Sequence, residues 1–141
     1  MGVFNVATWK PPTSIVNMYS AGGVISAVSL VLLYGKVVLS GALTATVYKE
    51  MLAVSGSGCI SQCVVYAVDT TSRTMGLKLV IDGVTVFDAT SATCTAANAG
   101  ISALGSGSTL QPVFFNTSLS ISIKSSLSET NKISVGYLYN V

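Results

Sequence analysis

Apolar and hydroxyl-bearing residues alternate with a period of two in the second half of this chain. Residues 118–123 place serine at every other position, and the apolar residues that alternate with serine are Leu119, Ile121 and Ile123. Residues 133–139 repeat the pattern with Ile133, Val135, Tyr137 and Tyr139. Because successive side chains of a strand point to opposite faces, both segments are predicted to be half-buried strands.

The pair Asp82-Gly83 lies between two β-rich runs, residues 77–81 and 84–88. Asp-Gly at this place predicts a two-residue type I′ hairpin. The turn would pair Ile81 with Val84, Leu79 with Val86, and Lys78 with Phe87. We therefore expect one core face made of Leu79, Ile81, Val84 and Val86.

Further strands are expected along the rest of the chain. Val24–Tyr34 and Lys36–Ser40 are interpreted as buried strands or as one hairpin around Gly35, and the other candidates are Leu43–Val47, Met51–Ser55 and Cys59–Val68. Clusters of Gly, Ser, Thr, Asp and Asn predict turns at residues 56–58, 69–72 and 129–132. Residues 90–111 are expected to form a long loop with one helical turn near Ala96–Leu104.

About eight short strands predict an all-β protein, an antiparallel β-sandwich of jelly-roll type spanning residues 21–141. Residues 1–20 are predicted to be an extended N-terminal arm, because Pro11 and Pro12 fix the backbone and favour extended neighbours. Phe4 and Trp9 could anchor this arm, with the two prolines, on a neighbouring subunit. A terminal strand folded on its own domain is the alternative.

Composition adds a constraint on the surface. Serine and threonine make up 34 of the 141 residues, whereas 9% of residues are charged and the formal net charge is +2. Low charge and high hydrophobicity exclude a disordered chain, and a charge of +2 neutralises few phosphates, so nucleic acid is not an expected partner. Weak self-repulsion favours association, and we expect a homo-oligomer, a trimer above other states.

The chemistry available to the chain is limited. It has no histidine, which removes Ser-His and Cys-His pairs, and only five acidic residues. We therefore expect no enzyme activity, no catalytic residue, no cofactor and no metal site. Three cysteines do not make a complete disulfide set and are expected to be reduced and structural. Arg73 follows Asp69 by four residues, so it either fixes that turn or meets a neighbouring subunit.

A membrane span is not expected. Residues 21–47 carry the single charge Lys36, but several glycines interrupt the apolar run, and a spanning helix needs about 20 apolar residues. The first residues do not resemble a secretory signal, because Pro11 and Pro12 come before any apolar run. A membrane-inserting subunit remains the less favoured alternative.

One stretch resembles a known class of proteins. Its segments are Leu43–Ala45, Val54–Gly58, Asp69–Thr74, Leu77–Asp88 and, later, Ser125–Ile133. They resemble small, hydroxyl-rich β-sandwich proteins of tailed-bacteriophage virions, such as capsid decoration (cement) proteins, fibres and neck or tail parts. The resemblance implies a virion location after synthesis in the host cytoplasm. It also implies partners such as the major capsid protein or other virion proteins.

Two functions of different class follow. The first is a structural subunit, a decoration protein that stabilises a shell through subunit contacts. The second is a fibre, neck or tail component that binds a host glycan or receptor through exposed aromatic and amide side chains. Most of the six tyrosines lie in β-rich runs, where packing is their expected role, and this favours the structural function.

Overall fold

The computed structural model describes residues 16–19, 25–28, 34–104 and 112–141, which form an all-β structure with no helix among them. The chain separates into two compact units: residues 1–33 with Asn140, and residues 34–139 with Val141. In the first unit, β1 (Val16–Tyr19) pairs antiparallel with β2 (Ile25–Val28), so part of the predicted arm is a strand of a hairpin. The predicted boundary after residue 20 lies outside the described residues.

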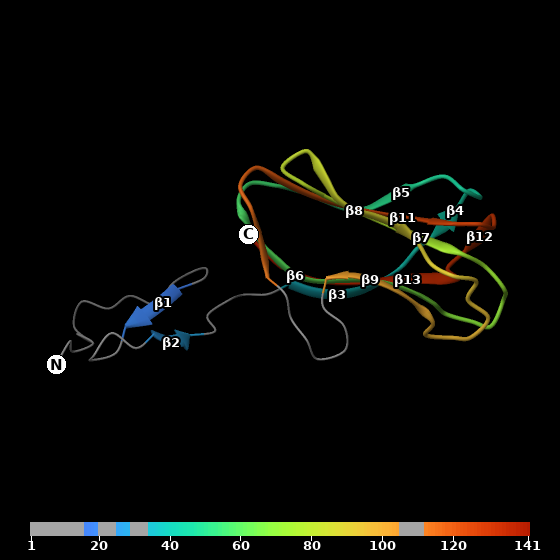
Figure 1. Ribbon diagram of the computed structural model, residues 1–141, viewed down its shortest axis with the longest axis horizontal. Coiled ribbons are helices and arrows are strands. Elements are labelled where there is room, and N and C mark those ends of the chain that lie inside the picture. Colours follow the sequence, from blue (N-terminus) through green and yellow to red (C-terminus); the bar gives the residue numbers. More distant parts are fainter. Residues whose placement is uncertain (1–15, 20–24, 29–33, 105–111) are drawn as a thin grey trace. The chain divides into compact units, whose positions relative to one another are not determined.

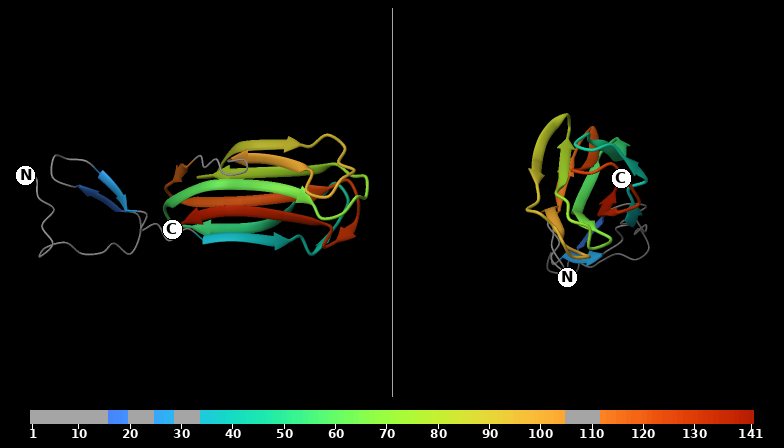
Figure 2. Two further views of the ribbon diagram at one scale, coloured as in Figure 1. Left: turned by 90° about the horizontal axis from the view of Figure 1, so that it is seen from below. Right: turned by 90° about the vertical axis from the view of Figure 1, so that its right-hand side faces the viewer.

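The second unit is a sandwich of two antiparallel sheets (Figures 1 and 2). The first sheet has the strand order β5-β11-β7-β8, with β5 (Lys49–Ser55), β11 (Ser118–Ser125), β7 (Met75–Ile81) and β8 (Val84–Thr90). The second has the order β10-β6-β13-β3, with β10 (Val113–Phe115), β6 (Gly58–Ala67), β13 (Ile133–Asn140) and β3 (Tyr34–Leu39). A fifth strand, β9 (Gly100–Leu104), also pairs with β6. The short strands β4 (Ala42–Leu43) and β12 (Glu129–Thr130) pair with each other.

The all-β, antiparallel class is as predicted. Strands distant in the sequence lie next to each other in both sheets, and this order is compatible with the predicted jelly roll, whose connectivity stays a prediction.

The hydrophobic core lies between the two sheets. Both alternating segments contribute as predicted: β11 buries its three apolar residues, and β13 packs its apolar side against the same cluster. The core residues from the two sheets are Ile60, Cys63, Val65, Ala67, Met75, Leu77, Leu79, Ile81, Phe115, Leu119, Ile121, Ile123, Ile133, Val135 and Tyr137. Burial of these faces is the main stabilising contribution to the sandwich.

The Asp82-Gly83 turn is confirmed, since both residues have positive φ (52° and 78°) and Ile81 pairs with Val84. The rest of the predicted register is wrong. A β-bulge at Val86 leaves this residue unpaired, so Leu79 pairs with Phe87 and Lys78 with Asp88. Phe87 instead packs against the core, whereas Val84 and Val86 are exposed on the edge strand β8.

The predicted strand Leu43–Val47 is wrong beyond its first residue: β4 ends at Leu43, and Thr46 lies in a turn with a φ of 63°.

Two other predictions are also wrong. Gly35 and Lys36 lie inside β3, where the pairing with β13 runs from Tyr34 to Leu39 without a turn. Ala96–Leu104 contains no helical turn; its second half is β9, because pairing with β6 satisfies its backbone groups. Within the described ranges, no helix has the length and hydropathy that crossing a membrane requires.

Candidate interaction surface

The outer side of the five-stranded sheet carries apolar residues that face away from the core. They alternate with core residues along each strand, and we call this surface the neutral face: Val37, Leu39, Val64, Tyr66, Phe114 and Leu138. Val37 and Phe114 are each 68% exposed, and Leu39 is 49% exposed. The outer side of a sandwich sheet is normally polar, so a run of apolar residues across four strands indicates a surface that meets a partner.

Gly136 lies in the middle of the neutral face and keeps it shallow. It pairs with Val37 across to β3. A Cβ atom at this position would lie 3.2 Å from Cγ2 of Val64 and 3.9 Å from the ring of Tyr66. The glycine therefore lets these side chains approach one another over the backbone of β13.

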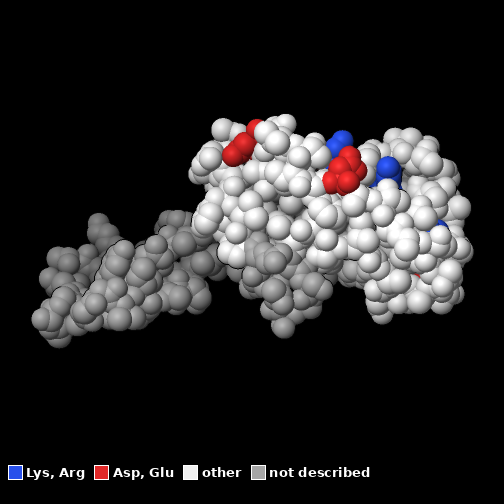
Figure 3. Space-filling model, in the orientation of Figure 1, with Lys and Arg blue, Asp and Glu red and all other residues white. Residues whose placement is uncertain are grey.

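Charged side chains gather on the outer side of the other sheet. Lys78 and Asp88 form an ion pair of 3.9 Å, and Glu50 accepts a hydrogen bond from Ser120. The ring of Tyr48 lies 5.2 Å from Nζ of Lys78 and 4.5 Å from Nζ of Lys124. In Figure 3, the most visible acidic and basic patches lie over the layer that contains β5, β7, β8 and β11. None of the six residues of the neutral face is charged, so the two outer sides differ in chemistry.

The phenol of Tyr48 is held within this charged cluster. It donates a hydrogen bond to Asp88. Partial burial, and then Asp88, raise the pKa of Tyr48 well above its ordinary value of 10.0. Tyr48 therefore remains protonated at neutral pH and links the charged side chains around its ring.

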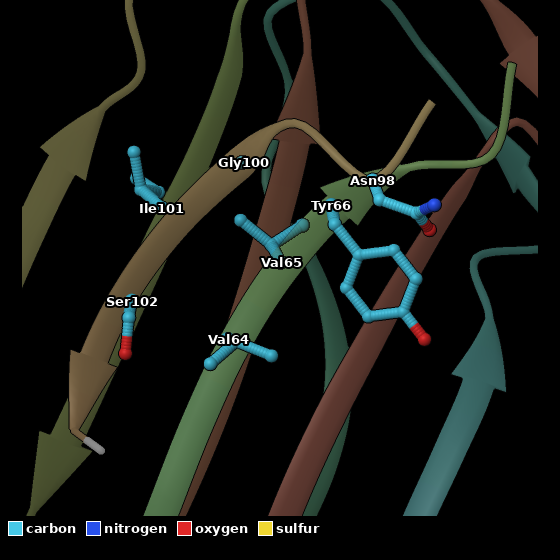
Figure 4. Close-up of a pocket in the computed structure, with 7 residues that line it drawn as sticks. All are labelled: Val64, Val65, Tyr66, Asn98, Gly100, Ile101 and Ser102. Atoms are coloured by element: carbon cyan, nitrogen blue, oxygen red, sulfur yellow. The ribbon is translucent and has the colours of Figure 1, made fainter. Parts of the chain in front are cut away.

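A hollow of about 380 Å³ opens beside the neutral face, between β6 and β9. Residues of both strands and Asn98 line it, and Figure 4 shows the Tyr66 ring close to the Asn98 amide. Asn98 has a φ of 65°, a left-handed conformation that asparagine tolerates better than most residues. An aromatic ring with an adjacent amide is an arrangement that can stack on and hydrogen-bond to a small polar molecule.

Gly100 allows β9 to approach β6 at this hollow. A Cβ atom at residue 100 would lie 1.9 Å from the carbonyl oxygen of Val65. The backbone of β9 therefore reaches its pairing distance only with glycine at this position.

Arg73 is the interface candidate that the structure describes, and its side chain is fully buried. Its guanidinium donates to Asp69 at 2.6 Å, to Glu129 at 3.0 Å and to the carbonyl oxygen of Lys132 at 3.5 Å. Arg73 and the nearby ammonium of Lys132 hold the pKa of Asp69 well below its ordinary range, and the hydrogen bond from Arg73 is the larger cause. Two roles were considered for Arg73 from the sequence: fixing the turn that contains Asp69, or meeting a neighbouring subunit. Its contacts in the structure are those of the first role.

The other interface candidates, Phe4, Trp9, Pro11 and Pro12, lie outside the described residues. The neutral face was missed from the sequence because it combines residues of distant segments, one of which, Lys36–Ser40, was interpreted as buried. The runs Val37-Val38-Leu39 and Val64-Val65-Tyr66 contain no polar residue that would mark the solvent side. The sequence therefore does not show which side of each strand faces the second sheet.

Asp82 connects the β7–β8 hairpin to the loop before β11. Its carboxylate accepts backbone N–H bonds from Thr117 (2.7 Å), Asn116 (2.9 Å) and Ser118 (3.1 Å). These donors, Thr117 first, lower the pKa of Asp82 from 3.8 to about 2. The residue therefore stabilises a tertiary contact as well as its own turn.

None of the three cysteines forms a disulfide, and all three are buried, as expected for structural thiols. Burial raises the pKa of Cys63 to about 12, so its thiol stays protonated and unreactive at neutral pH. Among the residues that the structure describes, no three histidine, cysteine, aspartate or glutamate side chains cluster in a way that could hold a metal ion.

Comparisons with known proteins show no family for this chain. No protein-family model matches it, and no curated protein matches it. Among solved structures, the chain is similar to one titled "Structure of infectious bursal disease virus Gt strain", with 20% identity and a TM-score of 0.32, over 76% of this chain and 30% of that one. It is also similar to dimeric latent PorU from Porphyromonas gingivalis, with 12% identity and a TM-score of 0.30, over 77% of this chain and 13% of that one. The chain thus spans less than a third of either protein, and similarities this low assign no function.

Proposed function

We propose that this protein is a structural subunit of a bacteriophage virion, most specifically a capsid decoration protein that stabilises the shell through contacts between subunits. The observation that supports the proposal is the neutral face, an exposed apolar surface on the outer side of a well-packed sandwich. The resemblance of the sequence to hydroxyl-rich virion proteins supplies the kind of assembly.

The energetics of the neutral face favour a subunit that works in contact with others. Full burial of a valine, leucine or phenylalanine side chain contributes about 1.5–3 kcal/mol. Val37, Leu39 and Phe114 do not gain a large part of this free energy while they are exposed to water. In a shell, the gain per subunit is repeated over many copies, and a net charge of +2 opposes this crowding only weakly.

The test is binding to shells of the phage that encodes the protein, assembled without it. We expect the purified protein to sediment with these shells and to raise the temperature at which they release DNA or fall apart. A double variant, Leu39→Glu with Phe114→Glu, should bind at least about tenfold more weakly. A matched variant on the other sheet, Val84→Glu, should bind like the wild type. Absence of binding by the wild-type protein would contradict the proposal.

A second function, glycan recognition as part of a fibre, neck or tail, is favoured by one specific observation. The hollow between β6 and β9 presents the ring of Tyr66 beside the amide of Asn98. Flat apolar sides of sugar rings stack on aromatic side chains, and their hydroxyls bind amides.

A glycan array with the purified protein tests this second function. Binding of a sugar that Tyr66→Ala and Asn98→Ala both abolish, while Tyr48→Phe retains it, would support recognition at the hollow. An array without reproducible binding would contradict it.

A further inference from the structure

The neutral face needs an occupant whose chemistry matches it. An uncharged apolar surface is best covered by another uncharged apolar surface, because a charge buried there without a partner is costly. A second copy of this chain supplies such a surface in equal amount and at the same concentration. Two copies packed through the opposite outer side would instead have to bury charged groups such as Lys78, Asp88 and Lys124.

The dimensions of the sheet are sufficient for such a contact. Strands about 4.8 Å apart with a rise of about 3.4 Å per residue give this sheet a face of roughly 500 Å². Two facing copies would bury on the order of 1,000 Å², which is about the lower limit for a specific protein interface. Gly136 keeps the middle of the face low, so the apolar side chains of both copies can come into contact there.

The edge of the same sheet also favours a neighbour. β3 pairs with β13 on one side, and among the described residues no strand pairs with its other side. Val37 and Leu39 of β3 are exposed and lie on the neutral face. An edge strand with exposed apolar side chains is a surface on which chains associate unless a partner covers it.

We infer that two copies of this chain pack neutral face against neutral face, in a contact that uses the same residues on both copies. The inference rests on the proposed function and deepens it: the subunit contact made by the neutral face is a contact between two copies of this chain, and the pair of copies binds the shell together. Separating the copies on the neutral face therefore also weakens shell binding. A symmetric contact of this kind closes into a dimer, whereas a trimeric ring needs two different surfaces on each copy.

Sedimentation velocity of the full-length protein over a range of concentrations tests the inference. We expect the wild type to be dimeric at micromolar concentration. Val37→Glu places a carboxylate inside the contact on each copy and should raise the dissociation constant at least about tenfold. The matched control is Val86→Glu, a similarly exposed valine on β8 of the other sheet, which should change the constant less than about twofold.

The other outcomes are equally informative. A dissociation constant raised as much by Val86→Glu as by Val37→Glu would indicate a contact between two different surfaces and would overturn the face-to-face arrangement. Circular dichroism establishes that each variant keeps its β-sheet, and Leu39→Glu provides a second test if Val37→Glu fails to fold. A wild type that stays monomeric but binds shells would overturn this inference and leave the proposed function intact. A dimer that binds no shell would do the reverse.

Discussion

At the scale of single residues, Arg73 is the clearest case of a side chain whose role depends on its surroundings. It is the only arginine of the chain, and its side chain is completely buried between the carboxylates of Asp69 and Glu129. Glu129 also accepts a hydrogen bond from Ser125 at 2.6 Å. Removing only the guanidinium would leave two acidic groups close together, with the ammonium of Lys132 beside Asp69 as the remaining compensation.

We predict that Arg73→Met lowers the free energy of unfolding by about 3–5 kcal/mol, the usual cost of breaking a buried ion pair from one side. Urea denaturation followed by circular dichroism measures it. Adding Glu129→Gln should recover part of the loss, because it removes one uncompensated charge. Arg73→Lys should recover little, since an ammonium lacks the planar fork that reaches both carboxylates. A loss below about 1 kcal/mol would show that the network is solvated.

Asp82 leads to a prediction about pH. Its pKa is lowered from 3.8 to about 2 in the folded protein, so the folded state binds protons less readily than the unfolded chain. Its contribution to stability is therefore complete above pH 4 and is lost as the pH falls from about 4 to about 2. Urea unfolding at several pH values should show Asp82→Asn less stable than the wild type at pH 7, with the gap narrowing towards pH 2. A gap that is constant with pH would contradict this role.

At the scale of elements, the pairing of β9 with β6 and the β7–β8 turn use glycine for different reasons. Gly100 is needed for space, because a Cβ atom would collide with the carbonyl of Val65. Gly83 has a φ of 78° and open space around it, so only its backbone conformation requires glycine. Substitutions that keep a left-handed conformation accessible should separate the two cases.

We predict that Gly100→Ala lowers the free energy of unfolding by about 2–3 kcal/mol, as overpacking against backbone does. Gly83→Ala should cost about 1 kcal/mol, and Gly83→Asn less, because asparagine adopts positive φ more readily. Gly100→Asn should be at least as harmful as Gly100→Ala. If urea denaturation shows that neither Gly100→Ala nor Gly100→Asn lowers the free energy of unfolding, β9 shifts freely along β6.

The elements also show how far sequence patterns can be trusted. Alternation of apolar residues with serine predicted the core side of β11 correctly, because one side of that strand faces water. The predicted register of β8 is wrong from Val86 onwards. A one-residue bulge there reverses which side chains of β8 face the core, and the pattern of apolar residues does not indicate the bulge. β9 was missed because its residues are small and mixed in polarity, and only pairing with β6 makes this segment a strand.

At the scale of the whole molecule, the charged cluster around Tyr48 and the neutral face lie on different sheets of the sandwich. The sequence isoelectric point is about 8.5. We predict that light scattering of the wild-type protein is greatest at pH 8–9, where net charge no longer opposes contact between copies. Val37→Glu should reduce that scattering more than Val86→Glu does. Equal effects of the two variants would indicate that total charge matters, rather than the neutral face.

The all-β class, the sides of β11 and β13 and the Asp82-Gly83 turn follow from the sequence alone, because alternation and turn chemistry are local properties. The tertiary structure decided which apolar residues are core and which are surface: Val65 is buried, whereas its neighbours Val64 and Tyr66 lie on the neutral face. It also decided that Arg73 is enclosed by Asp69 and Glu129, which are 60 positions apart in the chain. Hydropathy is a property of a residue, but exposure depends on which sheet covers it, and that is determined only when distant strands pair.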